Sequence, residues 1–85
     1  MKIRVKQSCS VIPSVTGSKG FLYPDDSRCF TVGEGATAEF LSYVSDRNES
    51  DLQAVAIKNS LVTGSDLNDR LGVYWISRKN LEDID

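Results

Sequence analysis

Short runs of β-branched and aromatic residues, separated by turn-forming residues about every 8–12 positions, constrain this chain more than any other feature. The strongest run, at residues 73–77, reads Val-Tyr-Trp-Ile-Ser, and strand-favouring side chains dominate it. Residues 2–7 alternate charged and apolar side chains, which is the period of a half-buried strand. We expect further strands at residues 28–32, 36–45 and 80–84. The spacing predicts an all-β fold, either a small barrel or two small packed sheets.

Residues 52–62 allow two interpretations. The Ser-Asp-Leu-Gln sequence at residues 50–53 has the form of a helix capping box, so one alternative is an α+β fold with a helix at residues 51–62. On a helical wheel, however, the apolar residues of this segment do not form one stripe, whereas Val55 and Ile57 would share one face of a strand. We favour the strand, with the polar residues 46–51 before it as a hairpin tip.

Several classes of chemistry are disfavoured by the residues that the chain contains. It has 85 residues and no histidine, so it lacks the commonest general base and the commonest metal ligand. Cys9 and Cys29 are too few for a zinc site or a disulfide framework, and we expect reduced, buried thiols. The acidic pairs at residues 25–26 and 82–83 lie in turn and tail contexts typical of solvated surface. We predict a protein that is not an enzyme, with no catalytic residues, no metal and no cofactor.

Hydrophobicity gives an expectation about location. The chain has no run of about 18 apolar residues, the length that a transmembrane helix needs. Its first residues also lack the apolar centre of a secretion signal. We expect a cytoplasmic protein with no membrane partner.

Basic residues are concentrated near the N-terminus. The formal net charge is −2, yet residues 1–30 carry five basic and only two acidic side chains. In an extended strand Lys2, Arg4 and Lys6 would project from one face about 6.6 Å apart, which is close to the spacing of phosphates along a single strand. Such a row would follow a nucleic-acid backbone and release its counterions. The alternative is that these residues only keep an edge strand soluble.

A second group of candidate residues lies near the C-terminus. Arg78 and Lys79 stand at a polar break after the strand at residues 73–77. Tyr74 and Trp75 precede this break, and an exposed aromatic ring there would stack on a base or line a groove, unless Trp75 belongs to the core. The predicted nucleic-acid-binding residues are Lys2, Arg4, Lys6, Arg78 and Lys79, with Tyr74 and Trp75 as possible stacking or groove residues.

The chain from residue 32 to residue 84 resembles an SH3-like barrel. Gly33 and Gly35 bound the entry to a first long strand, and the polar tip at residues 46–51 returns through residues 54–58. The last strong strand then meets the Ser-Arg-Lys break, after which Leu81 would close the barrel. The length of the chain predicts a single domain at residues 1–85, and we divide it into three parts. These parts are a basic N-terminal strand at 1–12, a loop-rich connection at 13–31 and an SH3-like core at 32–85.

The expected sheet has more apolar surface than one copy of the chain can bury. Residues 36–45 place apolar side chains on both faces of their strand. A chain of this size buries only about 60% of the surface that its unfolded form exposes, so it is poorly able to cover both faces of a sheet. We therefore expect a homodimer, in which the N-terminal strand either closes the barrel or exchanges with a second copy to give an intertwined pair.

The length, the absence of histidine and the basic first strand also resemble the small RNA-binding inhibitor of a toxin–antitoxin endoribonuclease carried by T4-like phages. That resemblance implies a non-catalytic accessory protein that binds RNA through a basic face and inhibits a host defence enzyme in the host cytoplasm. The alternative is a protein–protein interaction module without nucleic acid. It would use acidic loops at residues 46–51 and 66–69, or an aromatic groove lined by Tyr23, Tyr43, Tyr74 and Trp75.

Overall fold

A computed structural model describes residues 2–20, 22–41, 52–65 and 68–84, and across these residues the chain forms nine strands and two short 3-10 turns. The strands are β1 (Lys2–Val5), β2 (Cys9–Thr16), β3 (Leu22–Pro24), β4 (Phe30–Val32), β5 (Thr37–Leu41), β6 (Leu52–Lys58), β7 (Val62–Thr63), β8 (Leu71–Ser77) and β9 (Leu81–Asp83). The turns are η1 (Asn59–Leu61) and η2 (Arg78–Asn80). The all-β prediction is confirmed. The alternative helix at residues 51–62 is wrong, because β6 fills most of that segment.

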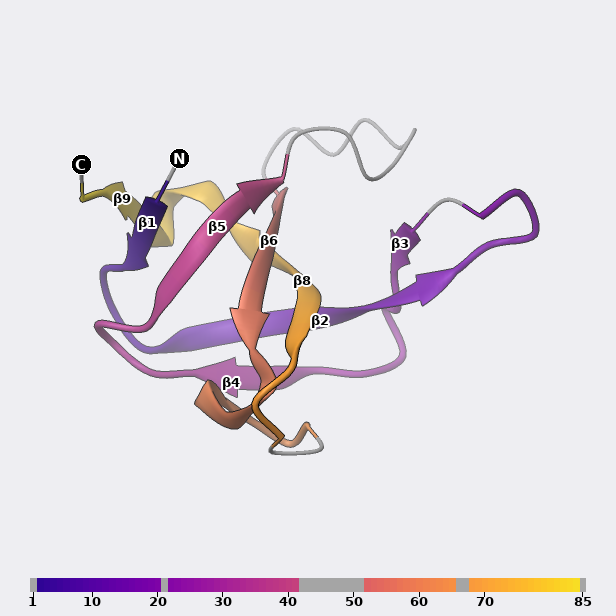
Figure 1. The fold of residues 1–85 in the computed structure, drawn as a ribbon, viewed down its shortest axis with the longest axis horizontal. Coiled ribbons are helices and arrows are strands. Elements are labelled where there is room, and N and C mark those ends of the chain that lie inside the picture. The colour runs from indigo at the N-terminus through magenta and orange to yellow at the C-terminus, as the bar shows by residue number, and fades with distance from the viewer. Residues whose placement is uncertain (1, 21, 42–51, 66–67, 85) are drawn as a thin grey trace.

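All strand pairs are antiparallel, in the order β7-β4-β2-β8-β6-β5-β1-β9, with β3 paired to β2. β1 and β9 lie side by side, so the two ends of the chain are close together (Figure 1). β2 crosses the region of β6 and β8 and continues with β3 as an arm that projects from the body of the molecule (Figure 1). This order places β6 between β5 and β8, in the middle of the sheet.

The core follows from the alternation of the strands. Ile3 and Val5 are buried while Lys2 and Arg4 are exposed, as the period-2 pattern predicts. The largest fully buried side chains come from six strands and are Val5, Val11, Val32, Val55, Ile57, Val62 and Ile76. Gln53 is also buried, and its amide Nε2 donates to the carbonyl oxygens of Leu41 and Ala54 at 2.6 and 2.9 Å. The buried polar group is therefore compensated by hydrogen bonds.

Residues 1–16 differ from the sequence expectation. The predicted strand at 1–12 is two strands, because the chain bends at residues 6–8. The first part of the loop-rich connection predicted at 13–31 is strand as far as Thr16. Pro13 lies inside β2, where the strand passes from β4 (at 9–11) to β8 (at 12–13) and then to β3 (at 14–16). A proline lacks the N–H that a ladder needs, and it is tolerated where the partner strand changes.

The polar break and the short final strand that we expect near the C-terminus are both present. The polar break before the last strand is η2, and Leu81 begins β9. The expected hairpin tip at 46–51 lies outside the described residues, although β5 and β6 on either side of it pair as a hairpin would. The SH3-like assignment stays a prediction. Within the part of the chain that the structure describes, no helix is long and apolar enough to cross a bilayer.

Candidate nucleic-acid interface

β1 does not lie at the edge of the sheet. It pairs with β5 on one side and with β9 on the other, so its backbone groups are already used. The interpretation that Lys2 and Arg4 only keep an edge strand soluble is therefore wrong. Both side chains are exposed on the face opposite Ile3 and Val5.

Acidic residues lie beside two of the predicted cations, and one of them forms an ion pair. Arg4 Nε donates to Glu82 Oε1 at 2.8 Å, and its Nη2 lies 2.6 Å from the same oxygen. Lys2 is in register with Glu39 on the neighbouring strand β5, and cross-strand partners share one face of a sheet. The predicted row of cations along β1 is therefore interrupted by acidic neighbours.

Three of the predicted cations do lie together. The Lys6 backbone N–H donates to the Asn80 carbonyl at 2.7 Å, and Gln7 Nε2 donates to Asn80 Oδ1 at 2.8 Å. These two hydrogen bonds hold the end of β1 against η2, which carries Arg78 and Lys79. All three basic side chains are exposed. We call Lys6, Arg78 and Lys79 the basic corner.

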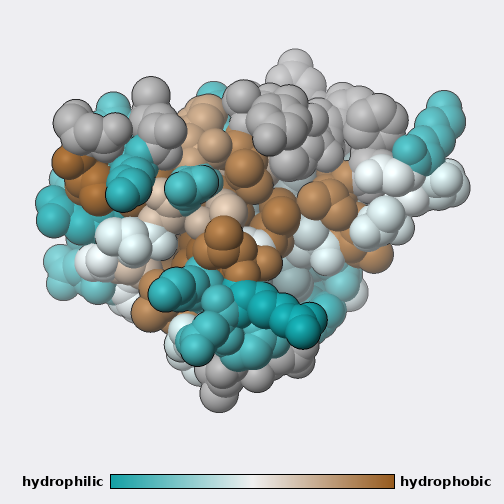
Figure 2. Space-filling model, viewed as in Figure 1, coloured by the Kyte–Doolittle hydropathy of each residue, from teal (hydrophilic) through white to brown (hydrophobic). Residues whose placement is uncertain are grey.

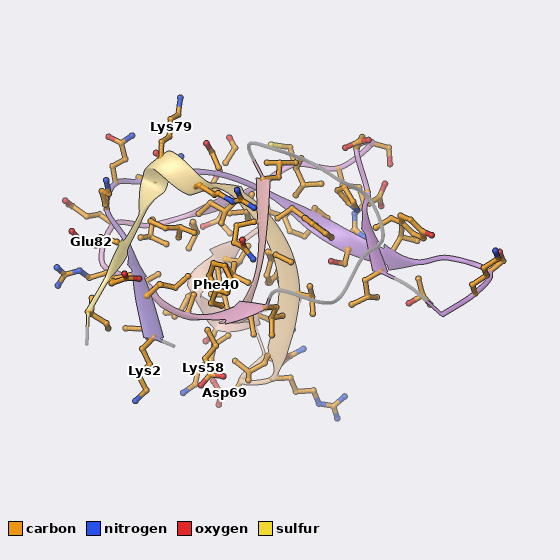
Figure 3. The ribbon with its side chains drawn as sticks, turned by 90° about the horizontal axis from the view of Figure 1, so that it is seen from above. Lys2, Phe40, Lys58, Asp69, Lys79 and Glu82 are labelled. Carbon is orange, nitrogen blue, oxygen red and sulfur yellow. The ribbon has the colours of Figure 1, made fainter. Side chains whose placement is uncertain are left out.

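The five predicted nucleic-acid-binding residues consequently divide into separate groups. Lys79 projects from one side of the molecule, whereas Lys2 projects from the opposite side together with Lys58 and Asp69 (Figure 3). Glu82, the partner of Arg4, lies between these two sides (Figure 3). The structure brings the three residues of the basic corner together and leaves Lys2 outside it.

The two predicted aromatic residues are buried. Trp75 Nε1 donates to Ser14 Oγ at 3.1 Å, and the Tyr74 hydroxyl donates to Asn59 Oδ1. Neither ring is exposed for stacking on a base, so the stacking prediction is wrong. Trp75 is instead a buried residue, which was the alternative interpretation of this side chain. Tyr74 does reach the wall of a cavity, as described below.

A groove of about 530 Å³ lies on the outer face of β1, β5, β6 and β8. Its apolar lining comes from Ala56, Leu61, Leu71 and Ile84, and Leu71 is 62% exposed. Lys2, Glu39, Lys58 and Asp69 supply charges of both signs around it. We call these eight residues the outer groove. Figure 2 shows hydrophobic surface over β5 and β6 with hydrophilic side chains along its margin.

The cysteines are free thiols, as expected, but the expected burial is wrong, because Cys9 is only partly buried and Cys29 is exposed. Cys9 is in register with Val32, and Cys29 precedes Val32 by three residues, about 10 Å along the chain. A disulfide needs Cα atoms within about 7 Å, so the two residues do not pair without a backbone movement. Burial raises the pKa of the Cys9 thiol, which makes it less reactive. Among the described residues, no three histidine, cysteine, aspartate or glutamate side chains gather as a metal site would require.

Sequence reasoning missed the outer groove and Arg28. Lys58 and Leu71 are in register across β6 and β8, although they lie far apart in the sequence. Arg28 lies over the ring of Phe30. These two residues are two positions apart in the expected strand at 28–32, so the sequence does place them on the same face of that strand.

A comparison of the chain with protein families, curated proteins and solved structures finds no match.

Proposed function

We propose that this protein is a non-catalytic binding protein that holds the phosphate backbone of RNA at the basic corner. The observation that carries the proposal is the 2.7 Å hydrogen bond from the Lys6 N–H to the Asn80 carbonyl, because it joins cations from opposite ends of the chain. Within the described residues, none of the three cations forms an ion pair, in contrast to Arg4. Exposed, unpaired cations gain most from binding phosphates, since they release condensed counterions.

The biological role in this proposal rests on the resemblance to the phage inhibitor. A phage-type accessory protein in the host cytoplasm would bind RNA at the basic corner and thereby hold a nucleic-acid-acting defence enzyme, such as a toxin–antitoxin endoribonuclease, in an inactive assembly. The absence of histidine supports a binding role over a catalytic one.

The test is a gel shift with single-stranded RNA. The variant Lys6→Glu/Arg78→Glu/Lys79→Glu should bind about 100-fold more weakly than the wild type, because three phosphate contacts are replaced by repulsion. The matched control Lys2→Glu/Lys19→Glu/Lys58→Glu makes the same charge change at exposed residues outside the basic corner and should bind much better. Circular dichroism establishes that both variants fold. A larger loss in the control, or no binding by the wild type at low salt, contradicts the proposal.

The Arg4–Glu82 pair gives a prediction in the opposite direction. Glu82→Gln should strengthen RNA binding several-fold, because it removes a negative charge beside η2 and leaves Arg4 free for a phosphate. The side chains of Arg4 and Glu82 are 49% and 39% exposed, so losing the pair should lower the free energy of unfolding by less than about 1 kcal/mol. Gel shift and urea unfolding measure the two effects. Weaker RNA binding by this variant would mean that phosphates do not approach this side of η2.

The outer groove favours a second candidate function, which is protein binding without nucleic acid. A second copy of the chain suits it, because a two-fold contact would bring Lys2 and Lys58 of one copy near Glu39 and Asp69 of the other. In this case the purified protein should sediment as a dimer, and Leu71→Lys should make it a monomer. A monomeric wild type at about 100 μM, well above the Kd of a stable dimer, would exclude this candidate.

A further inference from the structure

A second cavity, of about 270 Å³, lies between the arm formed by β2 and β3 and the strands β4 and β8. It is separate from the basic corner and from the outer groove, since it shares no lining residue with either. Pro13, Leu22 and Val73 supply apolar surface, and the rings of Phe30 and Tyr74 complete the wall. The two rings are tilted by 57°, with centroids 6.5 Å apart. A cavity of this size holds one planar group rather than a whole drug-sized ligand.

Arg28 lies at this cavity. Its guanidinium carbon is 4.9 Å from the centroid of the Phe30 ring, and the side chain is exposed. In the described part of the chain, no carboxylate pairs with it. A guanidinium that rests on an aromatic face is held in place while its N–H groups remain free at its edge, where they match the oxygens of a phosphate.

The cavity also offers hydrogen-bonding groups of both kinds. Ser14 Oγ donates to the Val73 carbonyl at 2.8 Å and accepts from Trp75 Nε1 at 3.1 Å, which leaves one lone pair. Asn59 Nδ2 donates to Asn68 Oδ1 at 3.1 Å, and a second N–H of that amide remains. Both residues line the cavity. An acceptor and a donor therefore line the same cavity as the aromatic rings and Arg28.

We infer that this cavity binds one nucleotide of an RNA strand, with the base against the Arg28–Phe30 pair and the phosphate on the Arg28 guanidinium. A base is flat, stacks on aromatic and guanidinium planes, and presents donors and acceptors on its edge. An acidic peptide side chain would use Arg28 alone and leave the rings and the amide without a role. The inference rests on the proposed function, from which it takes RNA as the class of ligand. The position of the bound nucleotide is taken from the cavity.

The experiment is an NMR titration of the ¹⁵N-labelled full chain with adenosine and uridine 5′-monophosphates up to about 10 mM, the range in which a single nucleotide binds. Both should shift the backbone amide signals of Ser14 and of residues 28–30 and 72–74. Arg28→Gln should weaken binding about tenfold, because it removes a charged hydrogen-bond donor from the exposed surface. Phe30→Leu should weaken it by a similar factor. Lys19→Gln, which removes an exposed cation on the arm, should have no effect.

Three results of the titration with the wild type would overturn the inference. No shift of these amides at the highest concentration would mean that the cavity binds no nucleotide. Equal shifts with inorganic phosphate alone would show an anion site without base recognition. Tighter binding of a glutamate-rich peptide would indicate a protein ligand.

The variant Lys6→Glu/Arg78→Glu/Lys79→Glu separates this inference from the proposed function. Retained nucleotide binding with lost RNA binding supports both, and lost nucleotide binding would place the nucleotide at the basic corner.

Discussion

Ile57→Ala should lower the free energy of unfolding by about 2–5 kcal/mol, the cost of deleting a buried isoleucine side chain and leaving a cavity. Ile57 is 0% exposed and lies in β6, the strand held between β5 and β8. A domain of this size is stable by only about 5–15 kcal/mol, so this single change should remove a large part of its stability. Urea unfolding followed by the fluorescence of the buried Trp75 measures the loss.

Ile84→Ala is the matched control for this change. Ile84 is 40% exposed, so the same truncation there should cost less than about 1 kcal/mol. Equal losses for the two variants would contradict the placement of the core on β6.

Gly72→Ala should destabilise the fold by about 2–4 kcal/mol, although it adds only one methyl group. A Cβ at this position would collide with Asn59 Oδ1 and would lie 2.9 Å from Cε2 of Tyr74. Asn59 Oδ1 accepts the hydrogen bond of the Tyr74 hydroxyl, so moving Asn59 removes the partner of a buried group. Gly72 is thus required for close approach of side chains and not for backbone conformation.

Gly33→Ala is the matched control, because it adds the same methyl group at a position without close neighbours. A Cβ at Gly33 would meet nothing within 4 Å, so this change should be nearly neutral, within about 0.5 kcal/mol, or slightly stabilising. Thermal unfolding of the two variants compares them directly. A neutral Gly72→Ala would contradict the packing of Asn59 and Tyr74 around β8.

The sequence predicts those elements that a local period determines. β1 and β8 are recognisable because their side chains alternate or are β-branched and aromatic. β6 is found because Val55 and Ile57 suit one face of a strand and no helical stripe exists. The strand through Pro13 was not predictable in this way, since it depends on a change of partner strand that no local pattern encodes.

The candidate site was even less predictable from local sequence patterns than the strands were. The Arg4–Glu82 pair joins residues 78 positions apart, so nothing near Arg4 in the sequence indicates that its charge is compensated. Similarly, the outer groove exists because β6 and β8 bring Lys58 and Leu71 into register. Lys6, Arg78 and Lys79 were nominated by their basic character, but only the contact between β1 and η2 singles them out from the other cations.

The most direct test of RNA binding at the basic corner is the salt dependence of the wild-type affinity for single-stranded RNA. Three phosphate contacts predict a slope of about −2 in a plot of log K against log[salt], since each contact contributes about −0.7. The Lys6→Glu/Arg78→Glu/Lys79→Glu variant should lose that slope together with the affinity. An affinity that does not change with salt, or a slope that is the same in the variant, would contradict RNA capture at the basic corner.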